Sequence, residues 1–417
     1  MAVLRINGGK RLCGETVVQG AKNSALPCLA AAALGRECIV HNCPDLTDTK
    51  AGLRILNALG VETEFENNTI ITKAPKCLSC SKINDDLMKE MRSSVMFLGA
   101  ILSKCGEAEI SYPGGCSIGA RPIDLHLKAF SQMGVNIREE GERIFCKVEK
   151  LKDAKIKLDF PSVGATENIM LLGVVSDCEF EVENPAREPE ILDLRNFLNS
   201  MGGNISEGKN GNLLIKGVKA LGNTEYKIIP DRIVALTYLS AIALCGGYGK
   251  IKAVRPDHIK LPLKFLEEAG NDIKCGEDYI EIKSPRRMRG FGIINTMPYP
   301  DFPTDAQAIF MAASLSSKGE SCFVENIFEN RFGHIPEFLK MGANIKMHDN
   351  SALVSGVRRL KGADLYAKDL RGGAALVVGA LSAKGESIIH NTEFIDRGYE
   401  NIERSFSDFG GEIVREG

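Results

Sequence analysis

The sequence predicts an α/β protein built from six copies of one β/α unit, each about 70 residues long. A short phrase centred on glycine recurs along the 417 residues, and successive copies of its glycine lie 68 to 74 residues apart. The six glycines are Gly60, Gly134, Gly202, Gly270, Gly342 and Gly410. Between them, stretches with helical periodicity alternate with short runs of alternating polarity, a pattern that favours helices packed against sheets.

Each unit starts with a helix of small apolar residues. These helices are expected over 21–34, 91–102, 231–244, 304–315 and 371–381. A short strand follows, as at 38–40, 179–182 and 321–324. A second helix then runs into the repeated glycine, because glycine readily adopts the left-handed conformation that ends a helix. A hairpin closes the unit, with turns such as Glu66-Asn67-Asn68 and Lys209-Asn210-Gly211.

The sixth unit ends after a single strand over 412–415 and lacks a hairpin partner. The N-terminal segment Val3–Gly8, followed by Leu12 and Gly14, has the pattern of the second hairpin strands at 213–217 and 352–356. Residues 1–20 are therefore predicted to complete the sixth unit and to bring both termini into one domain. The repeat alone leaves open whether the six units form one ring or two groups of three.

Composition excludes several classes of protein. Lys and Arg number 52 against 54 Asp and Glu, a net charge of −2, which argues against a strongly basic nucleic-acid protein. A hydrophobic fraction of 44% excludes disorder over most of the chain. The longest nearly apolar stretch, 25–35, is too short to span a bilayer. Thirteen cysteines without a secretory signal predict reduced thiols in a cytoplasm, and the lone Cys77-Leu-Ser-Cys80 lacks the second pair of a zinc ribbon.

Basic residues recur at the expected helix starts. Placed there, Lys or Arg opposes the helix dipole by about 0.3–1 kcal/mol each. One such residue is ordinarily part of a surface salt bridge, but a set at equivalent corners predicts a site for a polyanionic ligand. The set is Lys22, Arg92, Arg121, Arg187, Arg232, Arg331, Arg371 and Arg397.

A glycine-rich loop over 112–122 lengthens the second unit and carries Cys116 near Arg121. A nearby cation favours the thiolate, yet such a thiol can still donate a proton near neutral pH. Asp305 heads the helix over 304–315, and local sequence alone predicts that it caps this helix. Asp369 could pair with Arg371. His126 and His334 are expected to be structural or rim residues.

Several motifs together resemble one family. They cover the whole chain in one order and resemble the UDP-N-acetylglucosamine 1-carboxyvinyltransferase family, siblings of 5-enolpyruvylshikimate-3-phosphate synthase. They are Lys22-Asn23 in Gly-Ala-Lys-Asn-Ser-Ala, the Pro-Gly-Gly-Cys-Ser-Ile-Gly-Ala-Arg-Pro loop, Ser162-Val163-Gly164-Ala165-Thr166, Ala186-Arg187-Glu188-Pro189-Glu190, Phe302-Pro303-Thr304-Asp305, Glu329-Asn330-Arg331-Phe332, Asp369-Leu370-Arg371 and Asp396-Arg397-Gly398-Tyr399-Glu400.

The resemblance implies two inside-out α/β barrel domains of three repeats each, over 22–229 and over 1–21 plus 230–417. It implies transfer of the enolpyruvyl group of phosphoenolpyruvate to the 3′-hydroxyl of UDP-N-acetylglucosamine by addition and elimination, with release of phosphate. This reaction opens peptidoglycan precursor synthesis. It needs a general acid, a general base and cations, but no metal or redox cofactor, no nucleic acid and no membrane.

The resemblance also implies residue roles. Cys116 would be the general acid, would form a covalent adduct with phosphoenolpyruvate and would be the target of the epoxide antibiotic fosfomycin. Asp305 would be the base, assisted by Asp369. Phosphoenolpyruvate would be held through its phosphate by Lys22, Arg121 and Arg397, with Asn23 beside them, and through its carboxylate by Arg331 and Arg371. The UDP-sugar site would comprise Asn23, Arg92, Arg121, Pro122, Ile123, Asp124, Leu125, Ser162, Val163, Asp305 and Ile327.

One residue departs from the pattern and three alternatives stay open. Phe160 stands where family members often carry a basic residue, which leaves the uridine-side contacts open. The sibling reaction on shikimate 3-phosphate is disfavoured because that sibling lacks the loop thiol. A catalytically inactive UDP-sugar sensor is disfavoured by the retention of Cys116, Asp305 and the cations. A nucleic-acid clamp is disfavoured by the net charge of −2 and the lack of a basic run or aromatic platform.

Overall fold

The computed structural model describes residues 2–112, 118–119 and 122–417. Cys116 and Arg121, two predicted site residues, lie outside the described residues. The chain divides into two compact units: unit 1 comprises 1–19, 117–120 and 230–417, and unit 2 comprises 20–116 and 121–229. Each unit has its own hydrophobic core. The predicted α/β class is confirmed, since each unit combines helices with three sheets.

Unit 1 contains three four-stranded sheets, ordered β21-β22-β1-β23, β15-β16-β14-β2 and β17-β18-β20-β19. The strands are β1 (Val3–Gly8), β2 (Leu12–Val17), β14 (Gly247–Lys252), β15 (Asp272–Cys275), β16 (Tyr279–Ser284), β17 (Gly292–Asn295), β18 (Glu320–Val324), β19 (Asn344–His348), β20 (Ser351–Ser355), β21 (Asp364–Tyr366), β22 (Gly385–His390) and β23 (Glu412–Glu416). The helices are α8 (Arg232–Cys245), α9 (Lys260–Glu268), α10 (Thr304–Ser314), α11 (Ile335–Lys340), α12 (Leu370–Ser382) and α13 (Ile402–Asp408), with short 3-10 turns η3 (Pro256–Ile259) and η4 (Thr392–Phe394).

Unit 2 contains the sheets β11-β12-β10-β9, β13-β3-β5-β4 and β6-β8-β7. The strands are β3 (Glu37–His41), β4 (Glu62–Glu66), β5 (Thr69–Lys73), β6 (Glu107–Ser111), β7 (Val135–Glu140), β8 (Arg143–Val148), β9 (Ala154–Lys157), β10 (Glu179–Glu183), β11 (Asn204–Glu207), β12 (Leu213–Lys216) and β13 (Thr224–Lys227). The helices are α1 (Lys22–Ala32), α2 (Thr47–Ala58), α3 (Asp85–Glu90), α4 (Phe97–Cys105), α5 (Asp124–Met133), α6 (Val163–Gly173) and α7 (Pro189–Ser200), with 3-10 turns η1 (Arg92–Met96) and η2 (Lys209–Gly211).

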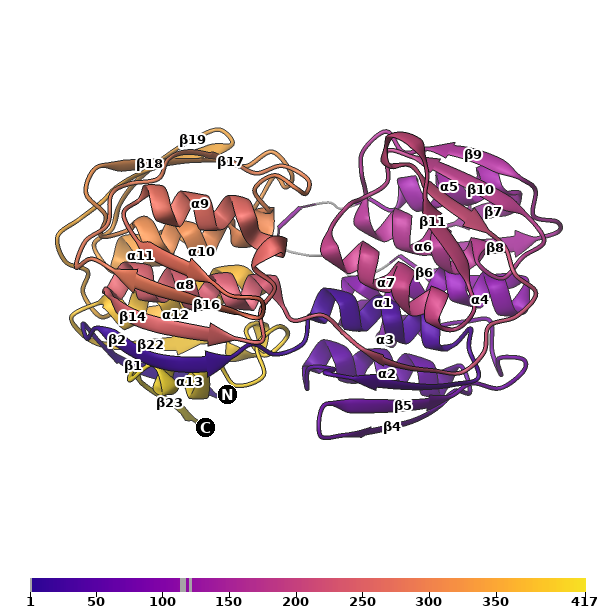
Figure 1. Cartoon of the computed structure of the whole chain (residues 1–417), viewed down its shortest axis with the longest axis horizontal. Helices are drawn as coiled ribbons and strands as arrows, with labels where there is room; N and C mark the ends of the chain where they lie inside the picture. The colour runs from indigo at the N-terminus through magenta and orange to yellow at the C-terminus, as the bar shows by residue number, and fades with distance from the viewer. Residues whose placement is uncertain (1, 113–117, 120–121) are drawn as a thin grey trace. The chain divides into compact units, whose positions relative to one another are not determined.

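Three helices form the centre of unit 1. Helices α8, α10 and α12 pack against one another, and the strands of the unit lie outside them (Figure 1). In α8 every residue except Cys245 is buried, as expected for a helix that is apolar on all sides. The charged residues of these helices lie in their first turns, with Arg232 in α8, Asp305 in α10 and Arg371 in α12. The first turns of the three central helices are therefore where charged side chains of this unit enter its core.

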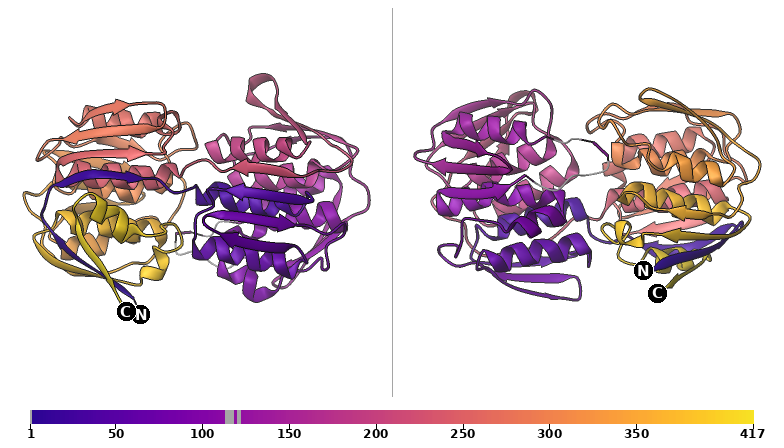
Figure 2. Two further views of the ribbon diagram at one scale, coloured as in Figure 1. Left: turned by 60° about the horizontal axis from the view of Figure 1, so that its bottom comes forward. Right: turned by 180° about the vertical axis from the view of Figure 1, so that it is seen from behind.

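The N-terminal strand completes the last sheet of unit 1, as predicted. Strand β1 pairs antiparallel with β23, with Ile6 opposite Ile413, and on its other side pairs with β22, with Leu4 opposite Ile389. Figure 2 shows the first and last strands of the chain side by side. Leu4 and Ile6 are fully buried, so the segment contributes to the core as well as to the sheet.

The six repeated glycines adopt the predicted conformation. Their φ angles lie between 78° and 103°, the left-handed region that side chains with a Cβ rarely adopt. The hairpin turns also agree with prediction, since Asn67 and Asn68 have φ of 50° and 57°. The six glycines therefore occupy the same position, after the second helix, in every repeat of both units.

Two elements of unit 2 differ from the regular repeat. The helix expected over 91–102 begins as the 3-10 turn η1, in which Ser94 Oγ lies 3.1 and 2.9 Å from the carbonyl oxygens of Met88 and Met91. In the described residues the sheet β6-β8-β7 has three strands, and a single parallel bridge between Lys82 and Glu109 stands where the other sheets carry a parallel strand. Among the described helices, none has the length and apolar character needed to cross a membrane.

Candidate active site

Asp305 lies between two buried arginines in unit 1. It is the second residue of α10, and its Oδ1 lies 2.7 Å from Arg331 Nη2. Its Oδ2 lies 3.2 Å from Arg371 Nη2 and 3.3 Å from Arg371 Nε. The arginine side chains are 4% and 3% exposed, whereas that of Asp305 is 30% exposed. The carboxylate therefore stays accessible while both cations that hold it are buried.

The local prediction that Asp305 caps its helix was wrong, and of the two aspartates it is Asp369 that caps one. Pro303 occupies the N-cap position of α10, and Asp305 lies inside the first turn, where its side chain reaches the arginines instead. Asp369 is the cap of α12: its Oδ1 accepts from the backbone N–H groups of Arg371 and Gly372, at 3.0 and 2.9 Å. Asp369 thus fixes the start of the helix that carries Arg371, and the guanidinium of Arg371 forms its ion pair with Asp305.

Arg371 stays charged despite its burial. Burial lowers the pKa of this guanidinium, but the Asp305 carboxylate, with Tyr399 and Asp231, more than offsets that effect and the net shift is upward. Its Nη1 also donates to the Tyr399 hydroxyl at 3.4 Å. Arg371 is therefore a fixed positive charge at the start of α12.

Arg331 has hydrogen-bonding capacity left over. Its Nη2 also lies 3.5 Å from the Thr304 carbonyl oxygen, and its guanidinium lies over the Phe328 ring at 5.5 Å. Its buried Nε has no hydrogen-bond partner within the described part of the chain. The neighbouring Asn330 donates its backbone N–H to the carbonyl oxygen of Ile118, at 3.0 Å, so a described part of the predicted catalytic loop lies close to this arginine.

Both histidines, expected to be structural or rim residues, are buried. His334 is buried, its Nε2 lies 3.3 Å from Met311 Sδ, and its ring packs edge-on against Phe338. Burial lowers its pKa to about 4, with Arg331 acting in the same direction and Asp369 opposing. In unit 2, burial together with Arg92 lowers the pKa of His126 to about 4.

The buried His334 should make the protein less stable in mild acid. Its folded pKa of about 4 lies below the unfolded value of 6.5, so the unfolded chain binds the proton first and stability falls as the pH drops through that window. Between pH 7 and pH 5 the loss should be about 2 kcal/mol from this residue. Urea unfolding of His334→Leu at both pH values should show a correspondingly smaller difference than the parent. His348→Gln, at an 88% exposed side chain, should change nothing, and an unchanged pH difference in His334→Leu would contradict the assignment.

In unit 2, Lys22 and Asn23 are the first two residues of α1. Lys22 Nζ lies 3.1 Å from Asp48 Oδ2, and both side chains are largely buried. Sequence reasoning did not predict the role of Asp48. Its place in the first turn of the next helix, α2, could have indicated it as a partner for Lys22. Ser24 donates to the buried Asp193 carboxylate, which also accepts from the Tyr226 hydroxyl at 2.6 Å. The start of α1 is therefore anchored on two carboxylates.

The other described residues of unit 2 that were predicted to bind the UDP-sugar lie at helix starts. Ser162 caps α6 by accepting from the Ala165 N–H at 3.3 Å, and Val163 is the first residue of that helix. The segment 122–125 leads into α5, and Arg92 begins η1. Phe160 is exposed. In unit 1, Ile327 follows β18, and Arg397 lies half-buried in the turn after η4. In unit 2, Arg187 donates to the Asn210 carbonyl oxygen at 2.9 Å.

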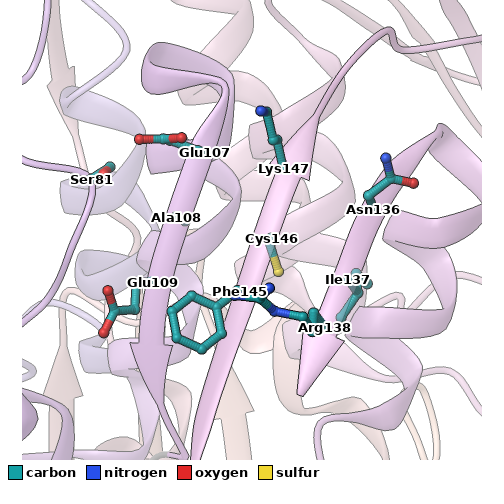
Figure 3. A pocket seen from close by; sticks show the side chains of 10 residues that line it. All are labelled: Ser81, Glu107, Ala108, Glu109, Asn136, Ile137, Arg138, Phe145, Cys146 and Lys147. Carbon is teal, nitrogen blue, oxygen red and sulfur yellow. The ribbon is translucent and has the colours of Figure 1, made fainter. Parts of the chain in front are cut away.

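Two hollows lie apart from Asp305, Arg331 and Arg371. One of about 400 Å³ opens on the sheet β6-β8-β7, lined by these strands and Ser81 (Figure 3). Its lining contains no predicted site residue, and Arg138 there lies over the Phe145 ring at 5.0 Å. Another of about 190 Å³ in unit 1 includes Arg232, Tyr299 and Pro303, directly before α10. Neither hollow is lined by Asp305. The candidate site is therefore identified by its ion pairs and not by the shape of a cavity.

The fold is that of an enolpyruvyl transferase. Residues 6–406 match the family model described as EPSP synthase (3-phosphoshikimate 1-carboxyvinyltransferase), so the chain belongs to this enolpyruvyl transferase family.

Relatives within the family are similar over their whole length. UDP-N-acetylglucosamine 1-carboxyvinyltransferase 2 of Caldanaerobacter subterraneus subsp. tengcongensis is 45% identical over 416 residues, with 100% of both chains covered. UDP-N-acetylglucosamine 1-carboxyvinyltransferase of Idiomarina loihiensis is 43% identical over 417 residues, with 100% of this chain and 99% of the relative covered.

Solved structures show the same fold at lower identity. The enolpyruvyl transferase NikO from Streptomyces tendae has a TM-score of 0.90 at 23% identity, covering 99% of this chain and 98% of that one. EPSP synthase from Acinetobacter baumannii has a TM-score of 0.77 at 18% identity over 100% of both chains.

Proposed function

We propose that this protein transfers the enolpyruvyl group of phosphoenolpyruvate to the 3′-hydroxyl of UDP-N-acetylglucosamine and releases phosphate, the first step of peptidoglycan precursor synthesis. The observation that carries the proposal is the half-exposed Asp305 carboxylate held by the buried Arg331 and Arg371. Such a group offers an acceptor for a hydroxyl proton directly beside cations suited to an anionic donor. Relatives at 45% and 43% identity that carry this activity in their names support the choice of acceptor.

The proposed mechanism uses an acid, a base and fixed cations. Cys116 delivers a proton to C3 of phosphoenolpyruvate while the sugar hydroxyl, relieved of its proton by Asp305, adds to C2. The tetrahedral adduct then loses a C3 proton and phosphate. Asp369 assists by fixing the start of α12 and with it Arg371. No step in this scheme needs a metal or a redox cofactor.

Substrate binding is assigned to charged and helix-start residues. Arg331 and Arg371 hold the donor carboxylate as buried, fixed cations, and Arg331 Nε, which has no hydrogen-bond partner among the described residues, offers a further donor. The donor phosphate is assigned to Lys22, Asn23, Arg121 and Arg397. The UDP-sugar is assigned to Asn23, Arg92, Arg121, Pro122, Ile123, Asp124, Leu125, Ser162, Val163, Asp305 and Ile327.

We extend the proposal to domain architecture and location. Each unit is proposed to be an inside-out barrel with sheets outside helices, which the buried character of α8, α10 and α12 supports for unit 1. A reduced cytoplasm is the proposed location, since the twelve cysteines within the described residues are all free thiols.

The acceptor is the decisive test of function. Purified protein with phosphoenolpyruvate should release phosphate when UDP-N-acetylglucosamine is added and should stay at background with shikimate 3-phosphate. The physical reason is that the two acceptors differ in size and charge, so one site cannot position both hydroxyl groups. Phosphate release and mass spectrometry of the enolpyruvyl product provide the measurement. Turnover with shikimate 3-phosphate alone would assign the protein to the sibling reaction instead.

A further inference from the structure

Glu325 is a buried carboxylate that sequence reasoning did not single out. It follows β18 directly and is 4% exposed. Asn350 fixes its backbone on both sides: the Glu325 N–H donates to the Asn350 carbonyl oxygen at 2.8 Å, and Asn350 Nδ2 donates to the Glu325 carbonyl oxygen at 3.1 Å. The side chain of Glu325 is therefore directed into unit 1 from a rigid support.

Its carboxylate joins three segments of the chain. Oε1 accepts from the backbone N–H groups of Ile327 and Phe328, at 2.9 and 3.2 Å. The same oxygen accepts from Thr296 Oγ1 at 2.9 Å, and Oε2 accepts from Thr304 Oγ1 at 3.0 Å. Hydrogen bonds to a buried charged acceptor are shorter and stronger than those between neutral groups, so these three segments are held firmly.

Two of these segments carry residues of the proposed site. Thr304 begins α10 and directly precedes Asp305. The carbonyl oxygen of Thr304 also lies 3.5 Å from Arg331 Nη2. On the other side, Ile327 is assigned to the acceptor, and Phe328 contributes the ring beneath the Arg331 guanidinium. One carboxylate thus links the start of α10 with the turn after β18.

The third segment is the loop between β17 and α10, which lengthens this repeat. Asn326 donates its backbone N–H to Thr296 Oγ1 at 2.9 Å and its side-chain amide to the Thr296 carbonyl oxygen at 3.2 Å. Thr296 also forms a bridge with Phe302, so the loop returns to the point at which α10 begins. The loop is therefore closed on the same carboxylate that holds Thr304.

We propose that Glu325 is a positioning residue for the sugar-nucleotide acceptor. It touches no reacting atom and acts through Asp305 and Ile327, whose relative placement it sets. The inference rests on the proposed function, because it assigns these two residues to the 3′-hydroxyl and the UDP-sugar. Arg371 keeps its own contacts with Asp305 and Tyr399, so the donor side depends less on Glu325.

Two substitutions of Glu325 separate positioning from charge. Glu325→Ala removes every hydrogen bond of the side chain and should raise KM for UDP-N-acetylglucosamine and lower kcat, together by about 10²-fold in kcat/KM, the scale expected for misplacing a reacting group by about 1 Å. KM for phosphoenolpyruvate should rise less than KM for the acceptor, because Arg371 keeps its own contacts and only Arg331 is reached through Phe328 and Thr304. Glu325→Gln should restore most of the loss, because its amide oxygen can take the place of Oε1 and its NH₂ can donate to Thr304 Oγ1.

Glu337→Ala is the matched control for burial. Glu337 is also a 4% exposed glutamate of unit 1, accepting from Lys340 Nζ at 2.6 Å and the Tyr366 N–H at 3.1 Å, outside the proposed site. It should lower the melting temperature as Glu325→Ala does, without changing either KM. Equal kinetic losses in the two alanine variants, or no recovery in Glu325→Gln, would overturn the proposal.

A second measurement separates this inference from the proposed function. Hydrogen exchange should show faster exchange of the Ile327 and Phe328 amides in Glu325→Ala than in the parent or in Glu325→Gln. If the parent protein fails to turn over UDP-N-acetylglucosamine, the proposed function is wrong, whatever the variants do. If the parent is active and the amides are freed in Glu325→Ala while KM for the acceptor stays unchanged, the function stands and the positioning role of Glu325 is wrong.

Discussion

Replacing Cys116 with serine should lower kcat by about 10²–10⁴-fold, the usual contribution of a general acid. A serine hydroxyl is far too weak an acid to protonate C3 of phosphoenolpyruvate near neutral pH, whereas a thiol near Arg121 in the sequence can do so. Cys116 lies outside the described residues, so this expectation rests on the sequence. Phosphate release under saturating substrates gives the measurement.

An aspartate at the same position should do better than serine. A carboxylic acid in a partly dehydrated site has its pKa raised and can then donate a proton. Cys116→Asp should therefore retain much more activity than Cys116→Ser. Fosfomycin, an electrophilic epoxide, should add a single label to the parent protein at Cys116 and none to the aspartate variant, as read by mass spectrometry. A fully active, folded serine variant would remove Cys116 from the acid role.

The repeat predicts most of the fold because its signals are local. Gly60 and its five counterparts end helices, and a positive φ at glycine is a property of a few adjacent residues. The pairing of β1 with β23 spans the whole chain, yet the pattern of Val3–Gly8 predicts it because each strand of a repeat has a counterpart elsewhere in the sequence. The single bridge between Lys82 and Glu109 was not predictable, since it is an exception to the repeat.

The site is predicted less completely because its decisive contacts join distant residues. Asp305 and Asp369 both stand at helix starts, so local sequence cannot tell which one caps a helix and which one pairs with arginines. The structure separates them through Arg331, 26 residues from Asp305, and Arg371, 66 residues from it. Glu325 has no motif of its own, since its importance comes from the donors that the fold brings around it.

Replacing Asp305 with asparagine should impair both catalysis and folding. The loss of the base should lower kcat by about 10²–10⁴-fold. An asparagine offers one acceptor oxygen for two guanidinium groups, and its NH₂ group would face the N–H groups of Arg331 or Arg371. Because removing one member of a buried ion pair typically costs about 3–5 kcal/mol and Asp305 is partly exposed, we expect a loss of unfolding free energy near the lower end of that range.

A second ion cluster in unit 1 has the reverse arrangement of charges, and it provides a control that separates the loss of catalysis from the loss of stability. Arg415 lies between two carboxylates, with Asp396 at 2.8 Å and Glu403 at 3.0 Å. Glu403→Gln therefore removes one carboxylate charge, while Arg415 keeps its ion pair with Asp396. Glu403→Gln should cost less stability than Asp305→Asn and should leave kcat unchanged. If urea unfolding shows that Asp305→Asn is destabilised but phosphate release stays within about threefold of the parent, far short of a general base's usual contribution, Asp305 is not the base. Its carboxylate would then act only to neutralise Arg331 and Arg371, and the proton of the 3′-hydroxyl would have to leave by another group.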